Sequence, residues 1–329
     1  MNKCYYGSLK NDNELCKSSS GGFAASIAKY AIQRQGVVYG VAYTSDYKGA
    51  EFIRATSNED IQKLRGSKYI HADTTLLKYG GGVFDDIIAG RMVVLIGLPC
   101  NISSVMTVLE NKGIAHENLV TIDLVCGGDT PASVGEQYIE YLERKFRSNV
   151  VEFSVRYKNP NWAPAHLRAV FENGKVFCKE FYSTEYGYAF DHMKREACYC
   201  CRFKGENHYS DITIGDGWGV CEKDRGYNAK GVSVAFVHSE AGNRILNELQ
   251  DIELFEAESN EMERNNPRYL TPKPKLQKDE QFRAAFQKYG LFRACKKAYG
   301  YKYRIMRVMP DGVMEYCRRI KHRMEILRK

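Results

Sequence analysis

Four cysteines in three separate segments have the clearest potential for chemistry in this chain: Cys100, Cys126, Cys198 and Cys201. Cys198 and Cys201 stand at positions i and i+3, so their thiolates can reach one metal ion, or one iron of a cluster, across a tight turn. Cysteine thiolate is a ligand of both zinc and iron–sulfur sites. The spacing therefore predicts a metal or cluster site, with Cys200 as a candidate replacement for either end of the loop.

The other two cysteines lie where neighbouring strands are expected to end. Cys100 and Cys126 each follow a strongly apolar run, at residues 92–96 and 120–125, that is typical of a buried strand. Ligands at the ends of two neighbouring strands, together with the C-x-x-C loop, would form a cradle for a cluster. We therefore expect all four thiols to converge in the fold.

Two glycine-containing segments are candidates for binding the phosphates of a ligand. The first is Ser19, Ser20, Gly21 and Gly22, directly before an apolar helical pattern over residues 23–32, where free backbone N–H groups can meet an anion. The second is Gly66, Ser67, Lys68 and Tyr69, in which Lys68 could neutralise a phosphate and Tyr69 could stack on a ring. The alternatives are an ordinary N-cap loop and a helix C-cap glycine followed by a solvated lysine.

Three further side chains follow apolar runs and are candidates for ligand contact. Asp123 and Asp216 could bind ribose hydroxyls or orient a ligand, although such acids more often cap a loop. Trp218 could line a pocket, with core packing as the alternative. These three residues complete the set of candidate binding residues outside the cysteines.

The elements that must position these residues indicate an α/β fold of mixed α+β character. Strands at 37–43, 92–96 and 120–125 alternate with helices at 23–32, 101–109 and 131–146, a pattern that favours a largely parallel sheet. After residue 148 the pattern becomes more antiparallel, and Asn173-Gly174 predicts a tight hairpin. Later segments predict strands at 151–157, 166–171, 175–181, 212–215 and 232–237, and helices near 185–195 and 240–249.

We divide the chain into three parts. Residues 1–148 form an N-terminal α/β half that carries the candidate anion-binding segments, and residues 149–260 form a second half that carries the cysteine loop. Residues 261–329 form a linker and a basic helical tail, with a proline-containing linker at 265–278.

Composition limits the class of protein. Of 329 residues, 44% are hydrophobic and 27% are charged, which excludes wholesale disorder. The N-terminus has no apolar signal core, so we expect a cytoplasmic protein whose eleven cysteines are kept reduced. That environment favours metal or redox use of the cysteines over a disulfide framework.

Positive charge is concentrated in the tail. Residues 282–329 contain fourteen Lys and Arg against three acidic residues, a net +11, so the remaining chain carries −3 of the total +8. Apolar residues recur there at helical spacing: Phe282, Phe286, Tyr289, Met314, Cys317, Ile320, Met324 and Leu327. A basic amphipathic helix predicts peripheral contact with the inner face of an anionic membrane. A helix packed on the body or on a second subunit is the alternative, and nucleic acid is not an expected partner.

Seven segments in order resemble the coenzyme F420 hydrogenase/dehydrogenase beta-subunit family, especially its short bacterial members from polysaccharide-biosynthesis loci. They cover roughly residues 5 to 250 and lie at 19–22, 64–69, 97–100, 123–128, 198–203, 211–219 and 230–233. The resemblance implies a flavoprotein with FAD and a [4Fe-4S] cluster. It also implies electron transfer between a deazaflavin or ferredoxin-type carrier and a substrate.

The resemblance also implies roles for the candidate residues. Cys100, Cys126, Cys198 and Cys201 become cluster ligands, and the segments at 19–22 and 66–69 become the flavin site. A structural zinc site that recruits His208 or Cys221 is the metal-site alternative. The implied activity is reduction of a sugar or lipid-linked sugar intermediate in polysaccharide biosynthesis. The alternative is a non-catalytic, metal-stabilised partner that scaffolds a glycan-assembly complex.

The chain departs from the family pattern at two positions. Gly127 follows Cys126 where the family usually has histidine, and Gly217 stands where the family has phenylalanine. We expect the second change to open the surface that the phenylalanine ring would cover. The chain also lacks the attached cysteine-rich ferredoxin-like segment of many relatives, so a separate electron donor is expected.

Overall fold

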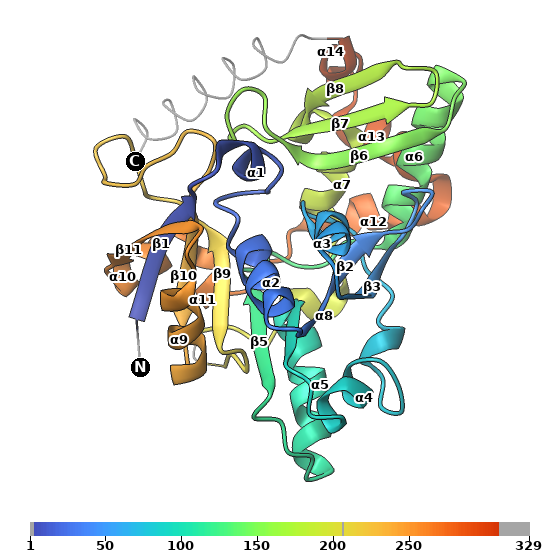
Figure 1. The fold of residues 1–329 in the computed structure, drawn as a ribbon. Helices are drawn as coiled ribbons and strands as arrows, with labels where there is room; N and C mark the ends of the chain where they lie inside the picture. The colour runs from blue at the N-terminus through green and yellow to red at the C-terminus, as the bar shows by residue number, and fades with distance from the viewer. Residues whose placement is uncertain (1–2, 206, 309–329) are drawn as a thin grey trace.

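The computed structural model describes residues 3–205 and 207–308, and its main element is a mixed sheet of eight strands (Figure 1). The strand order is β11-β1-β10-β9-β5-β4-β2-β3. The pairs β2–β4, β4–β5 and β5–β9 are parallel and the others are antiparallel. The strands are β1 Lys3–Leu9, β2 Val37–Tyr43, β3 Ala50–Ala55, β4 Val93–Gly97, β5 Leu119–Leu124, β9 Ile212–Asp216, β10 Ser233–Val237 and β11 Ile252–Ala257.

Helices cover both faces of this sheet because its central strands are apolar on both sides. Along β4, Val93 and Leu95 face one hydrophobic cluster and Val94 faces another, the alternation that a buried parallel strand requires. One face packs against α2 Phe23–Gln33, α3 Asn58–Leu64 and α9 Glu240–Glu248. The other packs against α4 Val83–Ile88 and α5 Pro99–Asn111. The predicted α/β class is thereby confirmed.

A second, three-stranded antiparallel sheet forms a separate layer, drawn at the top of Figure 1. It contains β6 Val150–Tyr157, β7 His166–Phe171 and β8 Val176–Glu180, and Gly174 adopts a positive φ in the β7–β8 turn, as the hairpin prediction requires. This sheet packs in one core with α6 Ala132–Phe146, α7 Glu185–His192, α12 Gln277–Tyr289 and α13 Leu291–Tyr299.

The stretch expected to be a linker is mostly exposed, but Asn266 and Tyr269 in it are buried. Prolines limit the helices there to short pieces, but the buried Tyr269 ring stacks on Phe236 with 4.1 Å between ring centroids. The three-part division of the chain stays a prediction, although strands from both sides of residue 148 share the large sheet. The remaining short helices are α1 Asp12–Cys16, α8 Glu196–Tyr199, α10 Ser259–Asn265, α11 Pro267–Leu270 and α14 Lys302–Val308, with 3₁₀ turns at Thr75–Leu77 and Phe181–Ser183.

The first part of the basic tail packs on the body. Phe282, Phe286, Leu291 and Cys295 are all buried in the core beneath the small sheet. The other apolar residues of the predicted amphipathic pattern, from Met314 onward, lie outside the described residues. Within residues 3–205 and 207–308, no helix combines the length and the apolar character needed to cross a membrane.

Candidate cofactor site

A cavity of about 510 Å³ opens where the carboxyl ends of β4, β5 and β9 meet the start of α2. Ligands of open α/β sheets bind at this edge, and the volume suits a cofactor-sized molecule. Most of the predicted site residues line it: Ser19, Ser20, Gly22, Gly66, Ser67, Lys68, Tyr69, Asp216, Trp218, Cys100 and Cys126. The fold thus brings both glycine-containing segments and two of the four cysteines to one cavity.

The cavity has more positive than negative side chains in its wall. Its carboxylates are Asp129 and Asp216, whereas its cations are Arg65, Lys68, Arg156, Arg195 and Arg268. A net positive lining favours an anionic ligand. A pyrophosphate group has the charge that this wall would attract.

The serine–glycine loop is held closely against its neighbours. A Cβ on Gly21 would lie 2.3 Å from the carbonyl oxygen of Gly7, so only glycine fits there, and Gly22 has φ +90° as the N-cap of α2. The Ser19 and Ser67 hydroxyls are 3.0 Å apart and hydrogen-bonded, which joins the two predicted segments. The loop therefore presents the start of α2 to the cavity in a fixed position.

The Lys68 ammonium caps the C-terminal end of α3, a role that the sequence did not indicate. Its Nζ donates to the carbonyl oxygens of Lys63, Leu64, Arg65 and Gly66 at 2.7–3.2 Å, which satisfies carbonyls at the end of α3. Burial lowers the Lys68 pKa to about 7, while the carbonyl dipoles around it favour the charged form. A lysine that caps a helix by bonding four carbonyls differs from both the phosphate-binding and the solvated lysine that we considered.

Tyr69 and Asp216 belong to one polar cluster centred on Arg156. The Arg156 guanidinium donates to both carboxylate oxygens of Asp216, at 2.9 and 3.1 Å, to the Tyr69 hydroxyl at 3.2 Å and to the carbonyl of Ser19 at 3.0 Å. The Tyr69 ring stacks on Phe190 at 4.2 Å between centroids. This bidentate ion pair ties β6 to β9 and to the serine–glycine loop.

Trp218 lies at the cavity wall and stacks on Trp162, with ring centroids 4.7 Å apart and Trp218 44% exposed. A Cβ on Gly217 would lie 2.9 Å from a Val232 side-chain carbon, so a larger side chain here would require Val232 to shift. The opening expected from the missing phenylalanine ring stays a prediction.

Asp123 lies outside the cavity lining, in a buried polar network beneath the sheet edge. It is fully buried and accepts a hydrogen bond from His208 at 2.8 Å, while Thr213 bridges His208 and His238. His208 also stacks on Tyr269 at 4.8 Å. Asp123 thus belongs to a buried network with His208 and Tyr269. Its contact with ribose hydroxyls stays a prediction.

This network makes stability depend on pH. Burial, followed by the nearby His208, lowers the His238 pKa from 6.5 to about 4, so the folded state keeps His238 neutral where the unfolded chain binds a proton. Stability is therefore expected to fall by up to about 3 kcal/mol as pH drops from about 6.5 towards 4. Urea unfolding at several pH values should show a shallower loss for His238→Gln than for the native chain, and equal slopes would contradict this account.

The four predicted cysteines converge. The pKa of the Cys100 thiol is raised to about 12, mainly by burial and then by the charges of Cys126, Asp129, Cys198 and Cys201. These four groups therefore lie close enough to Cys100 to interact with it electrostatically. Cys100 opens α5 directly after β4, and Cys126 follows β5, its parallel neighbour. Cys100 and Cys126 thus lie just after the ends of two neighbouring strands, as the sequence predicted.

The surroundings of these thiols suit an anionic iron–sulfur cluster. Backbone N–H groups of Gly128 and Asp129 donate to the sulfurs of Cys126 and Cys198 at 3.3 Å, an arrangement that stabilises cluster sulfur. Among the described residues, no three His, Cys, Asp or Glu side chains are close enough to hold a single ion. The group that these four thiols would hold therefore stays a prediction.

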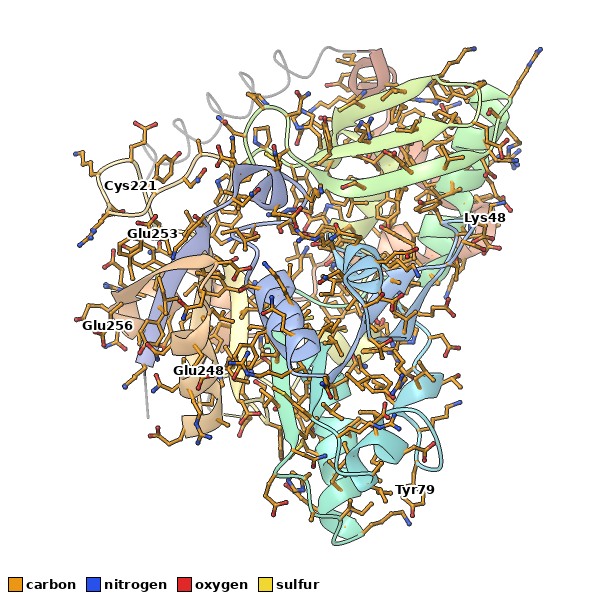
Figure 2. All side chains as sticks on the ribbon, viewed as in Figure 1. Lys48, Tyr79, Cys221, Glu248, Glu253 and Glu256 are labelled. Carbon is orange, nitrogen blue, oxygen red and sulfur yellow. The ribbon has the colours of Figure 1, made fainter. Side chains whose placement is uncertain are left out.

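The alternative ligands lie elsewhere. Cys200 is exposed and its sulfur contacts the carbonyl of Ala197, and Cys221 lies on an exposed loop beyond the outer edge of the large sheet (Figure 2). His208 bonds Asp123 as described above. The choice of ligands stays a prediction. Cys198 and Cys201 are partly buried, whereas Cys200 and Cys221 are exposed.

Sequence reasoning missed a second group of polar residues at the cavity. His71 Nδ1 lies 2.5 Å from Asp129 Oδ2, and the Arg195 guanidinium lies 3.7 Å from the same carboxylate oxygen. Backbone hydrogen bonds from His71 to Thr130 and from Arg195 to Asp129 align the three segments. A carboxylate bonded to one ring nitrogen orients a histidine for proton transfer. The position of Asp129 within the cysteine motif was the only signal in the sequence.

Comparison with known proteins identifies the family of this chain. Residues 4–78 match the N-terminal model, and residues 90–263 the C-terminal model, of the family described as coenzyme F420 hydrogenase/dehydrogenase, beta subunit. The chain belongs to this coenzyme F420 hydrogenase/dehydrogenase beta-subunit family, which confirms the resemblance found in its sequence.

Two individual relatives extend the comparison. The F420-dependent formate dehydrogenase 1 subunit beta of Methanococcus maripaludis is 24% identical over 237 residues, which are 68% of this chain and 54% of that protein. The chain therefore spans about half the length of this curated relative. A chain of the F420-reducing [NiFe] hydrogenase complex from Methanosarcina barkeri, known from a xenon-derivatized structure, shares the fold with a TM-score of 0.53 and 16% identity over 86% of this chain and 93% of that one.

Proposed function

We propose that this protein is a flavin- and iron–sulfur-dependent oxidoreductase that binds FAD in the cavity and a [4Fe-4S] cluster at Cys100, Cys126, Cys198 and Cys201. One observation carries the proposal: a single cavity is lined by the serine–glycine loop at the start of α2 and by two of the four converging cysteines. A cluster supplies one-electron transfer and a flavin converts this to hydride chemistry. The family membership supports an oxidoreductase role.

The residues of the cavity have separate tasks in this proposal. The first turn of α2 and the cationic wall bind the pyrophosphate, and Arg156 holds Tyr69 and Asp216 in place. The cysteine-bearing loops close one side of the cavity, which puts the two redox groups near each other. His71, oriented by Asp129, supplies or accepts a proton at the cavity wall.

The substrate and partners follow from the sequence resemblance. We propose a sugar or lipid-linked sugar intermediate of polysaccharide biosynthesis as the substrate, and a separate ferredoxin-like or deazaflavin donor as the source of electrons. The F420-dependent names of the relatives support a deazaflavin or a carrier of similar potential as the donor. Membrane contact of the tail stays a prediction, and residues 309–329 of the tail lie outside the described part of the chain.

Anaerobic purification followed by absorption spectroscopy and iron, sulfide and flavin analysis tests this function. The expected result is one flavin together with four iron and four sulfide per chain, the composition of the proposed cofactors. Colourless protein with one equivalent of zinc would contradict the proposal and favour a metal-stabilised scaffold.

A further inference from the structure

Lys194 is a buried cation that forms no ion pair with a carboxylate in the described part of the chain. Its side chain is 2% exposed, and its Nζ lies 3.5 Å from the centre of the Phe190 ring and 3.5 Å from the Thr130 hydroxyl oxygen. No carboxylate within residues 3–205 and 207–308 forms an ion pair with it: Asp191 contacts Lys273, Asp129 contacts His71, and the charges of both carboxylates act on Lys194 only from a greater distance. A buried ammonium is costly unless a counter-charge lies near it.

The same lysine lies beside the cysteine site. A Cβ built on Gly128 would lie 3.1 Å from side-chain carbons of Lys194 and 3.2 Å from Cβ of Cys198, so the lysine and the cysteine flank one glycine. The charge of Lys194 also interacts with the Cys126 thiol. The Lys194 side chain thus lies beside Cys198, and its charge acts on Cys126.

The other lysine near this site has a different task. Lys204 is also largely buried, but its Nζ donates to the carbonyl oxygens of Cys126 and Arg268 at 2.5 and 2.6 Å. Those bonds satisfy its ammonium within the protein and fix the loop after β5. The charges of both lysines act on the Cys126 thiol, but among the described residues the Lys194 Nζ bonds only the Thr130 hydroxyl.

We infer that Lys194 is the counter-charge of an anionic iron–sulfur cluster at the four cysteines and raises the reduction potential of that cluster. The inference rests on the proposed function, because it needs the cluster. A four-thiolate cluster is anionic and gains one more negative charge when it accepts an electron. A fixed positive charge in a low-dielectric site stabilises the reduced cluster more than the oxidised one, and the electron enters without a proton. Lys194 is therefore a positioning residue that tunes electron transfer.

A redox titration of the anaerobically reconstituted full-length protein tests this role. We expect Lys194→Met, which keeps the packing on Phe190 but removes the charge, to weaken one-electron reduction of the cluster at least tenfold, a shift of about 59 mV to lower potential. Lys194→Arg should stay near the native potential. Lys145→Met is the control, since the Lys145 Nζ also lies over aromatic rings, 5.3 Å from the centre of Phe146 and 5.1 Å from that of Phe177, but Lys145 does not line the cavity. This control should leave the cluster potential unchanged.

The outcomes separate this inference from the proposed function. Native protein without a cluster would overturn both. A fully loaded Lys194→Met protein with the native potential would overturn the inference alone. If neutral substitutions prevent cluster assembly, the arginine variant decides: assembly at the native potential supports a charge role, and loss of the cluster from a folded Lys194→Arg protein counts against it.

Discussion

A Cys198→Ser variant is expected to lose the iron–sulfur cluster, whereas Cys200→Ser keeps it. The Cys198 sulfur accepts a hydrogen bond from the Asp129 N–H at 3.3 Å and interacts with Cys100, while Cys200 faces outward near Ala197. Serine is a poor ligand for the soft iron of such clusters. Iron and sulfide content and the visible spectrum after anaerobic reconstitution would measure the difference.

The two substitutions stand two residues apart, so they control for each other. Circular dichroism should show native secondary structure in both variants, and flavin content should remain close to native in both. Full iron and sulfide in Cys198→Ser, or their loss only in Cys200→Ser, would contradict the ligand set proposed above. In the second case Cys200 would be the ligand at this end of the loop.

The second large effect is expected at Arg156. An Arg156→Met substitution leaves the largely buried Asp216 carboxylate and the Ser19 carbonyl without their shared donor. Breaking such a pair by removing one partner costs about 3–5 kcal/mol. The serine–glycine loop also loses an anchor, so flavin should be lost from the purified protein. Urea unfolding and flavin content after gel filtration measure both effects.

Arg168→Met is the matched control for this experiment. Arg168 lies on the neighbouring strand of the same small sheet and pairs with Glu152, whose side chain is 65% exposed. Such a pair contributes less than about 1 kcal/mol. Adding Asp216→Asn to Arg156→Met should recover part of the lost stability, because it removes the unpaired charge. Equal stability of the two arginine variants would contradict the central role of Arg156.

For Lys68 and Arg156, the contact partners of the side chains could not be predicted from the sequence. Gly66 and Lys68 were found because a glycine after a capped helix is a local pattern, but the sequence could not show that the ammonium folds back onto four carbonyls. Arg156 carried no local signal, since its partner Asp216 is 60 residues away. Likewise His71 and Asp129 meet across 58 residues.

The α/β alternation, the apolar strands, the cysteine loop and the family could all be predicted from the amino-acid sequence. These are local features, set by side-chain periodicity and by short motifs whose residues are neighbours in the chain. The contacts between distant side chains could not be predicted in this way, because strand order and loop packing set them. The fold places Asp123 in a buried histidine network and Lys194 beside the cysteines, where the cation forms no ion pair with a carboxylate among the described residues. Burial and charge balance depend on all surrounding elements at once, and no single segment of the sequence carries that information.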